Sequence, residues 1–410
     1  MWAISVANGT AQAVTYWQDI KPIIDEHCIS CHHNDGIGPM SLSTYEEVLN
    51  YATMVGYVTK HNIMPPWKAD FSYSRLKNEN SLTSTEIETI AQWINDGMSE
   101  GFVTNTAVTE VDPVIERRKW VEFEMQESFV HEGEYLAGWQ VFVIPNHLNQ
   151  DLYIDAVEFV PGNESIVQSV FISLDTTFKA SKLEKTDRKP GYYNLGGVGF
   201  LPSDFIWYHW NPESGTRYLK GGEVKKIDQN SSILMHVQYA PSSDNQEDRS
   251  KLRVRLNDEN QLNSTLVKSG ILAGPNDLLK GKFIRPHDVI SLRHRFMIEK
   301  PIDLYSVTPF GQYICKSWTI YAIKNGGEIK IPILKIDDWD VMWRRTYQLG
   351  KPLPLKPGDE ILISAEYDNT VNNDQLPQRV PRNVYPGEGK RGEMFMVTYE
   401  YVEPNENIKP

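Results

Sequence analysis

Apolar residues recur at helical spacing in two segments near the start of the chain. The first segment follows the capping-box spacing of residues 15–18, and its apolar stripe is Trp17, Ile20, Ile23 and Ile24. The second follows the same spacing at residues 83–86, stops at Gly97, and has the stripe Ile87, Ile90, Trp93 and Ile94. We expect two helices that bracket a helical unit of about ninety residues.

From Trp120 onward the apolar period changes to two. Short alternating runs such as residues 121–125 and 152–157 are broken by Pro, Gly and Asn turns, which is typical of antiparallel β-sandwiches. Residues 104–113 have no periodicity and are a predicted linker, and the polar break at residues 260–275 divides the β region into two units. We expect no helix of any length in this region.

Composition indicates about three domains and excludes nucleic acid as a partner. The chain has 410 residues, 40% hydrophobic residues and a net charge of -13. Residues 14–100 contain twelve acidic and five basic side chains, so this segment carries about -7. An acidic face steers a basic partner protein at low ionic strength, although a merely solvated surface explains the charge equally well. No apolar run approaches the roughly twenty residues that cross a bilayer, so we predict no transmembrane segment.

Two thiols and a histidine carry the strongest chemical signal. Cys28 and Cys31 are three positions apart, and His32 follows at once. This pattern predicts covalent attachment of one haem c, in which the thiols bond to the porphyrin vinyl groups and the imidazole reaches the iron from the proximal side. A zinc site or a redox dithiol is the alternative. Zinc, however, needs a second pair of ligands, and the third cysteine, Cys315, is distant and alone.

Met64 is the predicted distal ligand of the haem iron. Pro65 and Pro66 follow it and cannot continue a helix, so they hold the backbone extended and present the thioether to the iron. Thioether ligation raises the reduction potential, which suits electron transfer. The alternative is that Met64 is a core methionine. The other candidate ligands nearby are Met40, Met54, His27, His33 and His61.

The haem motif also indicates the compartment. Bacteria attach c-type haem outside the cytoplasm, so we expect the protein to be exported to the periplasm or another extracytoplasmic site. Residues 1–13 end in Ala11-Gln12-Ala13, which is consistent with the tail of a signal peptide. They lack a basic start and a full apolar core.

Short sequences in a characteristic order make the chain similar to a known family. Near the start they are residues 28–32, 38–42 and 64–67 and the helix through Trp93; in the β region they are residues 156–162, 234–239, 248–250, 347–349, 368–369 and 392–394. Together they resemble the copper type II, ascorbate-dependent monooxygenases, the family of peptidylglycine and dopamine hydroxylases, in a bacterial form with a cytochrome c domain in front. The resemblance implies a multidomain fold class: a small all-α cytochrome c domain at 14–104, a linker at 105–117, and two all-β jelly-roll-like sandwiches at 118–266 and 283–405.

The first copper site of that family is largely absent from this sequence. The family uses an adjacent histidine pair and a later histidine, but Gln168 and Ser169 stand at the place of the pair, and His236 matches the later ligand. A single imidazole cannot hold copper tightly. The alternative is a rebuilt site in which His209 joins His236.

The second copper site is depleted in the same way. The family uses a His-x-His strand and a methionine, whereas Phe310 and Gln312 stand in the strand here and Met394 matches the methionine. The residual positions His236 and Met394 should therefore be empty, and copper is not an expected cofactor.

These inferences predict an extracytoplasmic c-type cytochrome that passes single electrons through its haem to a redox partner protein. The copper-depleted, monooxygenase-like β module would dock that partner or bind a ligand in the cleft between the sandwiches, without monooxygenase activity. Two alternatives remain open. One is a working copper monooxygenase that receives electrons from its own haem, and the other is a structural subunit of a larger envelope complex.

Overall fold

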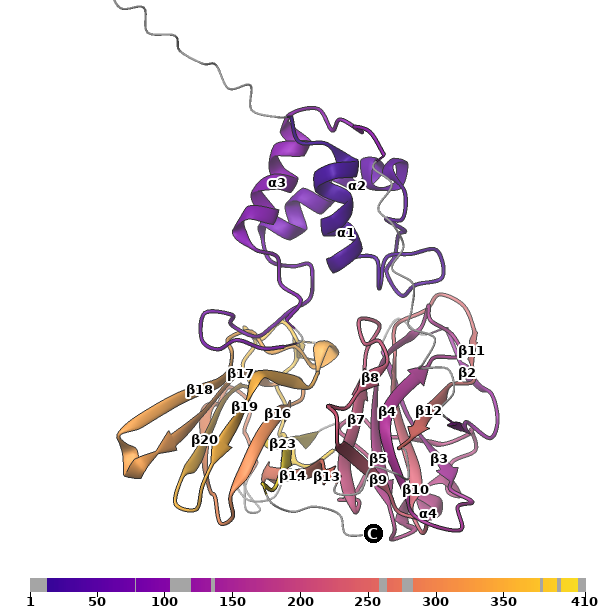
Figure 1. Ribbon diagram of the computed structural model, residues 1–410, viewed down its shortest axis with the longest axis vertical. Helices are drawn as coiled ribbons and strands as arrows, with labels where there is room; N and C mark the ends of the chain where they lie inside the picture. Colours follow the sequence, from indigo (N-terminus) through magenta and orange to yellow (C-terminus); the bar gives the residue numbers. More distant parts are fainter. Residues whose placement is uncertain are drawn as a thin grey trace, which may run out of the picture. The chain divides into compact units, whose positions relative to one another are not determined.

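The computed structural model describes residues 13–77, 79–103, 119–133, 137–257, 264–274, 283–376, 379–388 and 392–404. The chain divides into two compact units, which are described separately. The helical unit comprises residues 1–67 and 80–112, and the β unit comprises residues 68–79 and 113–410 (Figure 1). The predicted linker at 105–117 and nearly all of the predicted signal-peptide remnant at 1–13 lie outside the described residues.

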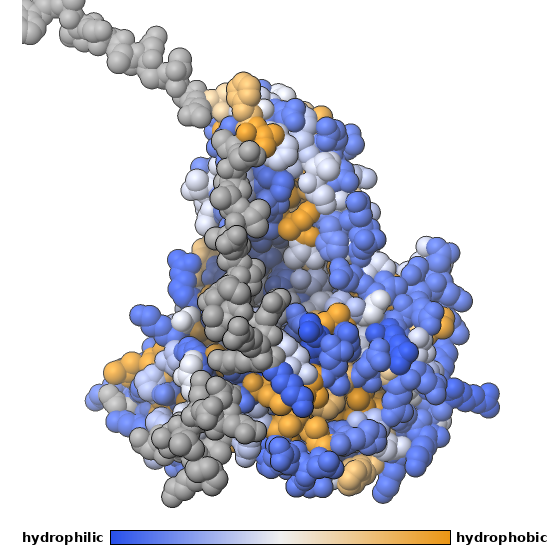
Figure 2. Space-filling view, turned by 45° about the vertical axis from the view of Figure 1, so that its right-hand side comes forward, coloured by the Kyte–Doolittle hydropathy of each residue, from blue (hydrophilic) through white to orange (hydrophobic). Residues whose placement is uncertain are grey.

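The described residues of the helical unit form one π-helical turn and three α-helices around a small apolar core. Its core includes Ile20, Ile24, Val48, Ile90 and Trp93. The elements are η1 (Tyr16–Ile20), α1 (Lys21–His27), α2 (Tyr45–Lys60) and α3 (Ser84–Asn95). Several large side chains of this unit nevertheless stay exposed, among them Tyr51, Met54, Tyr57 and Ile63. Figure 2 shows apolar patches on the surface of this unit. The unit therefore presents apolar area to a ligand or a partner.

Capping boxes start two of these helices. The predicted box at Thr83 and Glu86 is confirmed, and Gly97, with a φ of 91°, follows the end of α3. Thr44 and Glu47 form a second box at the start of α2, a helix that sequence analysis missed although the same spacing is present there. The predicted box at Thr15 is wrong, because the Thr15 side chain caps no backbone N–H and the chain begins with a π-helical turn.

The predicted fold class is wrong. The chain is mostly β, with 41% strand and 15% helix, and its fold is a β-sandwich in which no all-α cytochrome c domain is evident. The capping boxes and apolar stripes are strong local signals for individual helices. The segments around these helices, residues 28–44 and the described residues of 61–83, contain no helix. The described residues include one further short helix, α4 (Lys179–Glu184), within the β region where none was expected.

The first sandwich is built from two sheets that face each other across an apolar core. One sheet has the strand order β1-β12-β4-β9-β13 with β8 beside β4, and the other has the order β6-β3-β10-β5-β7; β2 and β11 form a separate pair. The core side chains include Val157, Ile172, Met235 and Leu252. The strands are β1 (Trp120–Glu124), β2 (Phe129–His131), β3 (Gly138–Pro145), β4 (Leu152–Val160), β5 (Val167–Asp175), β6 (Tyr192–Tyr193), β7 (Asp204–Trp210), β8 (Arg217–Tyr218), β9 (Glu223–Ile227), β10 (Ser232–Tyr239), β11 (Gln246–Asp248), β12 (Lys251–Leu256) and β13 (Thr265–Leu266).

The second sandwich pairs two four-stranded antiparallel sheets. Their orders are β14-β23-β16-β19 and β15-β20-β17-β18, and the Trp318 ring of the second sheet contacts Phe395, the residue just before β23 of the first. The strands are β14 (Lys268–Ala273), β15 (Val289–Met297), β16 (Ile302–Phe310), β17 (Cys315–Lys324), β18 (Ile329–Ile336), β19 (Tyr347–Leu355), β20 (Glu360–Asp368) and β23 (Met396–Val402), with a small parallel pair β21 (Tyr385–Pro386) and β22 (Gly392–Glu393).

Both faces of the β3-β10-β5-β7 sheet are covered. One face lines the core of the first sandwich, and the other packs Phe171 and Leu234 against Phe310, Met394 and Met396 of the second. Every residue of β5 and β10 is consequently buried. Polar residues on the second face, among them Gln168 and His236, therefore lie in a protein interior.

A segment between the helices belongs to the β unit. Residues 68–79, which we call the strap, run along the edges of the second sandwich. Ala69 bridges to Ile336 and Leu76 to Leu349, and Lys68 forms an ion pair with Asp338 at 3.1 Å. The strap lies inside the predicted 14–104 domain, so that stretch is not one continuous structural unit.

Candidate haem segment and the buried interface of the β unit

The end of α1 places the two thiols on one turn of the backbone. The N–H of Cys28 donates to Ile24 O at 2.9 Å, and the N–H groups of Cys31 and His32 donate to Cys28 O at 3.1 and 3.0 Å. Neither thiol is part of a disulfide, and both residues are half-buried. Burial, together with the nearby Cys31 and Asp25, raises the pKa of Cys28 to about 12. A redox dithiol needs a lowered thiol pKa, so this environment disfavours that alternative.

The imidazole of His32 is held in a defined tautomer. Its Nδ1 lies 3.0 Å from the carbonyl oxygen of Met40. A carbonyl oxygen only accepts hydrogen bonds, so Nδ1 carries the proton and Nε2 keeps its lone pair. This arrangement, with the far ring nitrogen anchored to a backbone carbonyl, is the one that metal-ligating histidines use.

Gly38 allows this close approach. A Cβ at Gly38 would lie 2.5 Å from His32 Nδ1 and 2.8 Å from Cys31 O, so no larger residue fits without moving the imidazole. The Gly38 N–H also donates to Cys31 O at 2.7 Å. The Gly-Pro-Met sequence after the motif thus has a physical role, because it closes a loop that supports the His32 imidazole.

The zinc alternative finds no support in the described residues. Within them, one group of three metal-capable side chains converges, and it consists of Glu26, His27 and Glu86 without either thiol. Both ring nitrogens of His27 already have partners, Asn80 Oδ1 at 2.7 Å and Glu86 Oε1 at 3.3 Å. His27 is therefore also a poor candidate for a haem ligand.

The candidate distal ligands occupy different environments. Met64 follows α2, is half-buried, and its N–H donates to Val58 O at 3.3 Å. Met40 packs against the helical core, and Met54 is 52% exposed on α2. His61 is exposed, with its ring 4.5 Å from that of Tyr57. Ligation by Met64 stays a prediction.

In the β unit, one of the two residues at the place of the histidine pair, Gln168, is hydrogen-bonded to the second sandwich, whereas the buried Ser169 hydroxyl has no hydrogen-bond partner in the described residues. Gln168 donates its Nε2 to Met342 O at 2.9 Å, and Gln238 donates to the same oxygen at 3.0 Å. Met342 belongs to a 3-10 turn, η4 (Val341–Trp343). The two amides therefore tie β5 and β10 to the second sandwich, which gives Gln168 and Gln238 a structural role.

The two histidines of the proposed rebuilt site are kept apart. On neighbouring strands, His236 of β10 is paired with Phe171 of β5, and Phe171 is paired with His209 of β7. The Phe171 ring stacks on His209 at 4.5 Å. Two strand spacings of about 4.8 Å separate the histidine backbones by roughly 10 Å, with an aromatic residue between them.

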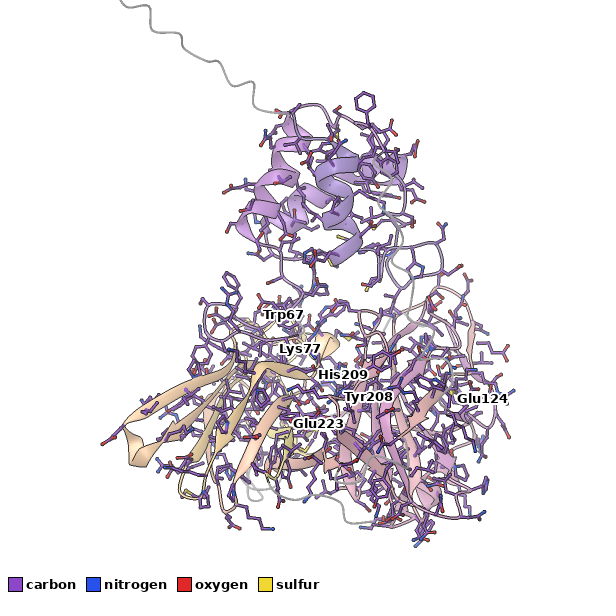
Figure 3. All side chains as sticks on the ribbon, in the orientation of Figure 1. Trp67, Lys77, Glu124, Tyr208, His209 and Glu223 are labelled. Carbon is purple, nitrogen blue, oxygen red and sulfur yellow. The ribbon has the colours of Figure 1, made fainter. Side chains whose placement is uncertain are left out.

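One ring nitrogen of each imidazole is hydrogen-bonded to the backbone. His236 Nε2 lies 2.9 Å from Asn194 O and is therefore the protonated nitrogen, and His209 Nδ1 accepts the N–H of Thr346 at 3.3 Å. Burial lowers the pKa of both rings to about 3, and Arg344 acts in the same direction on each. Figure 3 labels His209 beside Tyr208 within the β unit.

Met394, the residual position of the second copper site, lies against a backbone loop. A Cβ at Gly196 would come within 2.7 Å of Met394 Sδ and 2.9 Å of Gln312 Nε2. The Gln312 amide donates to Gly387 O at 3.0 Å. His236 contacts the same loop at Asn194, so the loop fills the space beside both residual positions.

A buried guanidinium completes this interface, and sequence analysis did not find it. Arg344 is 2% exposed, lies over the rings of Phe171 and Phe310 at 5.8 Å each, and donates to Leu195 O at 3.3 Å and Gly196 O at 3.5 Å. A fixed positive charge here repels a copper ion. The residues present therefore do not fit copper at either position.

Comparisons with known proteins add little. Neither a scan of protein families nor a search of curated proteins gives a match. Among solved structures, a peptide-N(4)-(N-acetyl-beta-D-glucosaminyl)asparagine amidase is 7% identical, covering 71% of this chain and 98% of that chain with a TM-score of 0.26. The structure of PNGF-II is 9% identical, covering 71% and 66% with a TM-score of 0.25. TM-scores this low support no conclusion about fold or function.

Proposed function

We propose that the chain is an extracytoplasmic electron-transfer protein that carries one covalently attached c-type haem. Cys28 and Cys31 would form the thioether bonds, His32 would be the proximal ligand and Met64 the distal ligand. The observation that carries the proposal is the hydrogen bond from His32 Nδ1 to Met40 O, which leaves Nε2 available to iron.

The chain's own residues support a haem in three ways. The turn at the end of α1 presents two thiols, Gly38 leaves room for the imidazole, and Met40 fixes its orientation. The haem would supply a one-electron couple between ferrous and ferric iron. Within the described residues, no helix is both long and apolar enough to cross a membrane.

The β unit, in this proposal, docks a redox partner or binds a ligand and performs no copper chemistry. Arg344 and the loop at residues 194–196 occupy the space beside His236 and Met394. A working monooxygenase would need several nitrogen or sulfur donors at each metal, and the donors present are already hydrogen-bonded or isolated. This is why we favour electron transfer over oxygen chemistry.

The experiment compares a double variant, Cys28→Ala with Cys31→Ala, against the single variant Cys315→Ala. Cys315 is a buried free thiol in the β unit, so it controls for the loss of a cysteine. All three proteins are purified after periplasmic export with haem-attachment machinery and extracted with acid acetone. We expect covalent haem in the wild type and in Cys315→Ala, and none in the double variant. Covalent haem in the double variant, or none in the wild type, would refute the proposal.

A further inference from the structure

Three metal-capable side chains converge where α1 ends and α3 begins. They are Glu26 and His27 of α1 and Glu86 of α3, and one oxygen or nitrogen atom from each lies within 4.8 Å of the other two. All three residues belong to the helical unit. The group contains neither thiol, so it is distinct from a zinc site at Cys28 and Cys31 and from the haem residues.

The His27 imidazole is buried and held in one tautomer. Its side chain is 8% exposed, and its Nδ1 lies 2.7 Å from Asn80 Oδ1. An amide oxygen only accepts hydrogen bonds, so Nδ1 carries the proton and Nε2 presents its lone pair to Glu86. An acceptor at the far ring nitrogen is the arrangement that orients metal-ligating histidines.

The contact between His27 and Glu86 calls for a cation. Nε2 lies 3.3 Å from Glu86 Oε1, and the lone pairs of these two atoms repel each other. Either a second proton on the imidazole or a metal ion removes this repulsion. Two ligands at about 2.0–2.1 Å from a tetrahedral zinc ion lie about 3.3–3.4 Å apart, so the observed spacing already suits a metal.

The Glu86 carboxylate is fixed in place by the capping box of α3. Its Oε2 accepts hydrogen bonds from the backbone N–H and the hydroxyl of Thr83, at 2.7 Å each, while Oε1 faces His27. Burial would raise the pKa of this carboxyl group, but the Thr83 hydrogen bonds and His27 lower it below its usual value. The cap therefore also positions a negatively charged ligand atom.

Glu26 supplies a third ligand atom and a second negative charge. It is exposed, and among the described residues its carboxylate has no hydrogen bond or ion pair to give up. Two carboxylates balance the charge of a divalent ion. The imidazole favours a first-row transition ion over calcium or magnesium, because those hard cations prefer oxygen ligands.

We infer that Glu26, His27 and Glu86 bind one zinc ion, with water as the fourth ligand. The ion would join the end of α1, one residue before Cys28, to the start of α3. Because Glu26 is exposed, the ion would exchange with solution, unlike zinc in a closed structural site. The site uses none of the haem residues, so either proposal can fail without the other.

The test measures zinc binding to the full-length protein, purified without a histidine tag and freed of metal with EDTA. Equilibrium dialysis against zinc chloride at neutral pH should show one ion per chain with a dissociation constant on the order of 10 µM. Glu26→Gln should weaken binding at least about tenfold, because a neutral amide replaces a charged ligand. The matched control is Glu46→Gln, which changes an exposed glutamate on α2 and should bind like the wild type.

A second pair of variants tests the imidazole. His27→Gln should abolish saturable zinc binding, whereas His147→Gln, which changes an exposed histidine of the β unit, should retain it. No saturable binding to the wild type, or equal weakening by Glu46→Gln or His147→Gln, would overturn the site. Calcium chloride that binds as tightly as zinc chloride would overturn the assigned class of metal.

Discussion

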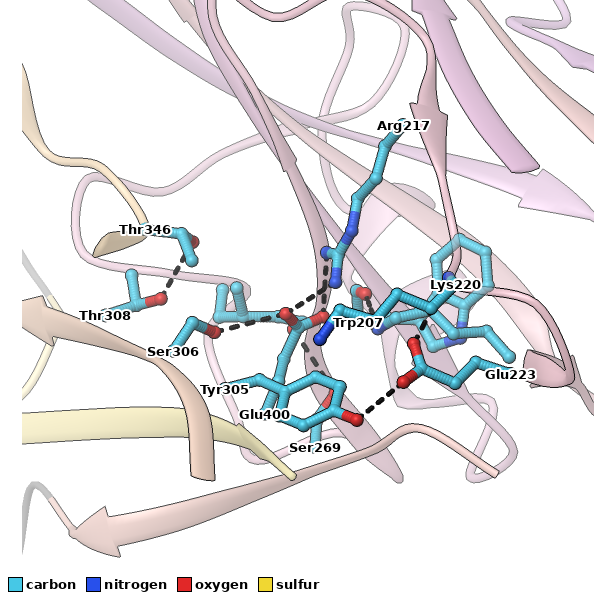
Figure 4. Close-up of polar contacts among 12 residues, drawn as sticks. Trp207, Arg217, Lys220, Glu223, Ser269, Tyr305, Ser306, Thr308, Thr346 and Glu400 are labelled. Carbon is cyan, nitrogen blue, oxygen red and sulfur yellow. Dashed lines mark hydrogen bonds and ion pairs between the residues drawn. The ribbon is translucent and has the colours of Figure 1, made fainter. Parts of the chain in front are cut away.

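Arg217 of β8 and Glu400 of β23 form a two-fold hydrogen-bonded ion pair that joins the two sandwiches. The Nη1–Oε1 and Nη2–Oε2 distances are 3.0 and 2.9 Å, and Lys225 Nζ lies 2.7 Å from the same carboxylate (Figure 4). Ser306 donates a further hydrogen bond to Glu400 at 3.1 Å. Burial alone would raise the pKa of Glu400, but the two cations outweigh it and lower the pKa to about 2.

Glu400→Gln should destabilise the β unit by about 3–5 kcal/mol, because it leaves two buried cations without their counter-charge. The measurement is urea unfolding at neutral pH. Since the folded-state pKa of Glu400 lies below the value of 4.5 for a free glutamate, its contribution is present above that value and is lost as pH falls toward 2. The variant should lack this acid-dependent loss.

The control for this prediction is Glu122→Gln. Glu122 pairs with Lys251 at 3.1 Å and Arg253 at 3.0 Å, but its side chain is 47% exposed. Exposed pairs contribute about 0–1 kcal/mol, so this variant should unfold almost like the wild type. Equal destabilisation by both variants would contradict the role of the buried pair.

His209→Phe should change how stability depends on pH. Burial, followed by Arg345 and Arg344, lowers the pKa of His209 to about 3, whereas a free histidine titrates near 6.5. As pH falls below 6.5 the unfolded chain binds this proton and the folded chain does not, so stability falls by up to about 1.4 kcal/mol per pH unit. Unfolding of the variant at pH 7, 5.5 and 4.5 should show that slope reduced. The control variant His147→Phe, which changes an exposed histidine, should leave the slope of stability against pH unchanged.

Met64→Ala should remove iron–sulfur bonding. The oxidised protein is expected to show the weak absorption near the red edge of the visible spectrum that reports a thioether ligand, and the variant should lose it and have a lower reduction potential. Met54→Ala, which changes a half-exposed methionine on α2, is the control and should retain the band. Loss of the band in Met40→Ala, with retention in Met64→Ala, would reassign the ligand.

Gly38→Ala should disturb the proximal side while the thioether bonds remain. The added methyl group would lie 2.5 Å from His32 Nδ1, so the imidazole must move or the loop must open. We expect covalent haem with altered axial-ligand absorption, and a loss of about 1–3 kcal/mol in the free energy of unfolding. Gly215→Ala, where a Cβ meets nothing within 4 Å, is the matched control. An unchanged spectrum in Gly38→Ala would mean that His32 is not held as described.

Copper should be absent from the purified protein after dialysis, and ascorbate should support no hydroxylation. The structure also predicts that histidines at positions 168, 169, 310 and 312 will not suffice, because Arg344 lies over the Phe310 ring. Adding Arg344→Leu to that variant should raise copper affinity at least about tenfold by removing a like charge. Stoichiometric, tightly held copper in the natural protein would revive the monooxygenase hypothesis.

Local signals were predictable from sequence where they depend on neighbouring residues. The capping box at Thr83 and the alternation in β4 are short-range patterns, and both elements form as expected. The position of Phe171 between two histidines depends on strand order, and the burial of Arg344 depends on packing between two sandwiches. Neither arrangement leaves a periodic pattern in the sequence. From sequence alone, the only indication that the copper positions are not usable was the missing histidines.

The strap has a practical consequence for dissecting the protein. The chain passes between the two units at residues 67–68, 79–80 and 112–113, so no single proteolytic cut separates one whole unit from the other. A fragment that begins at residue 113 would lose the strap and uncover the backbone at Ile336 and Leu349, and exposed strand edges promote aggregation. A soluble β fragment will therefore need residues 68–79 supplied as a peptide or fused through a redesigned terminus.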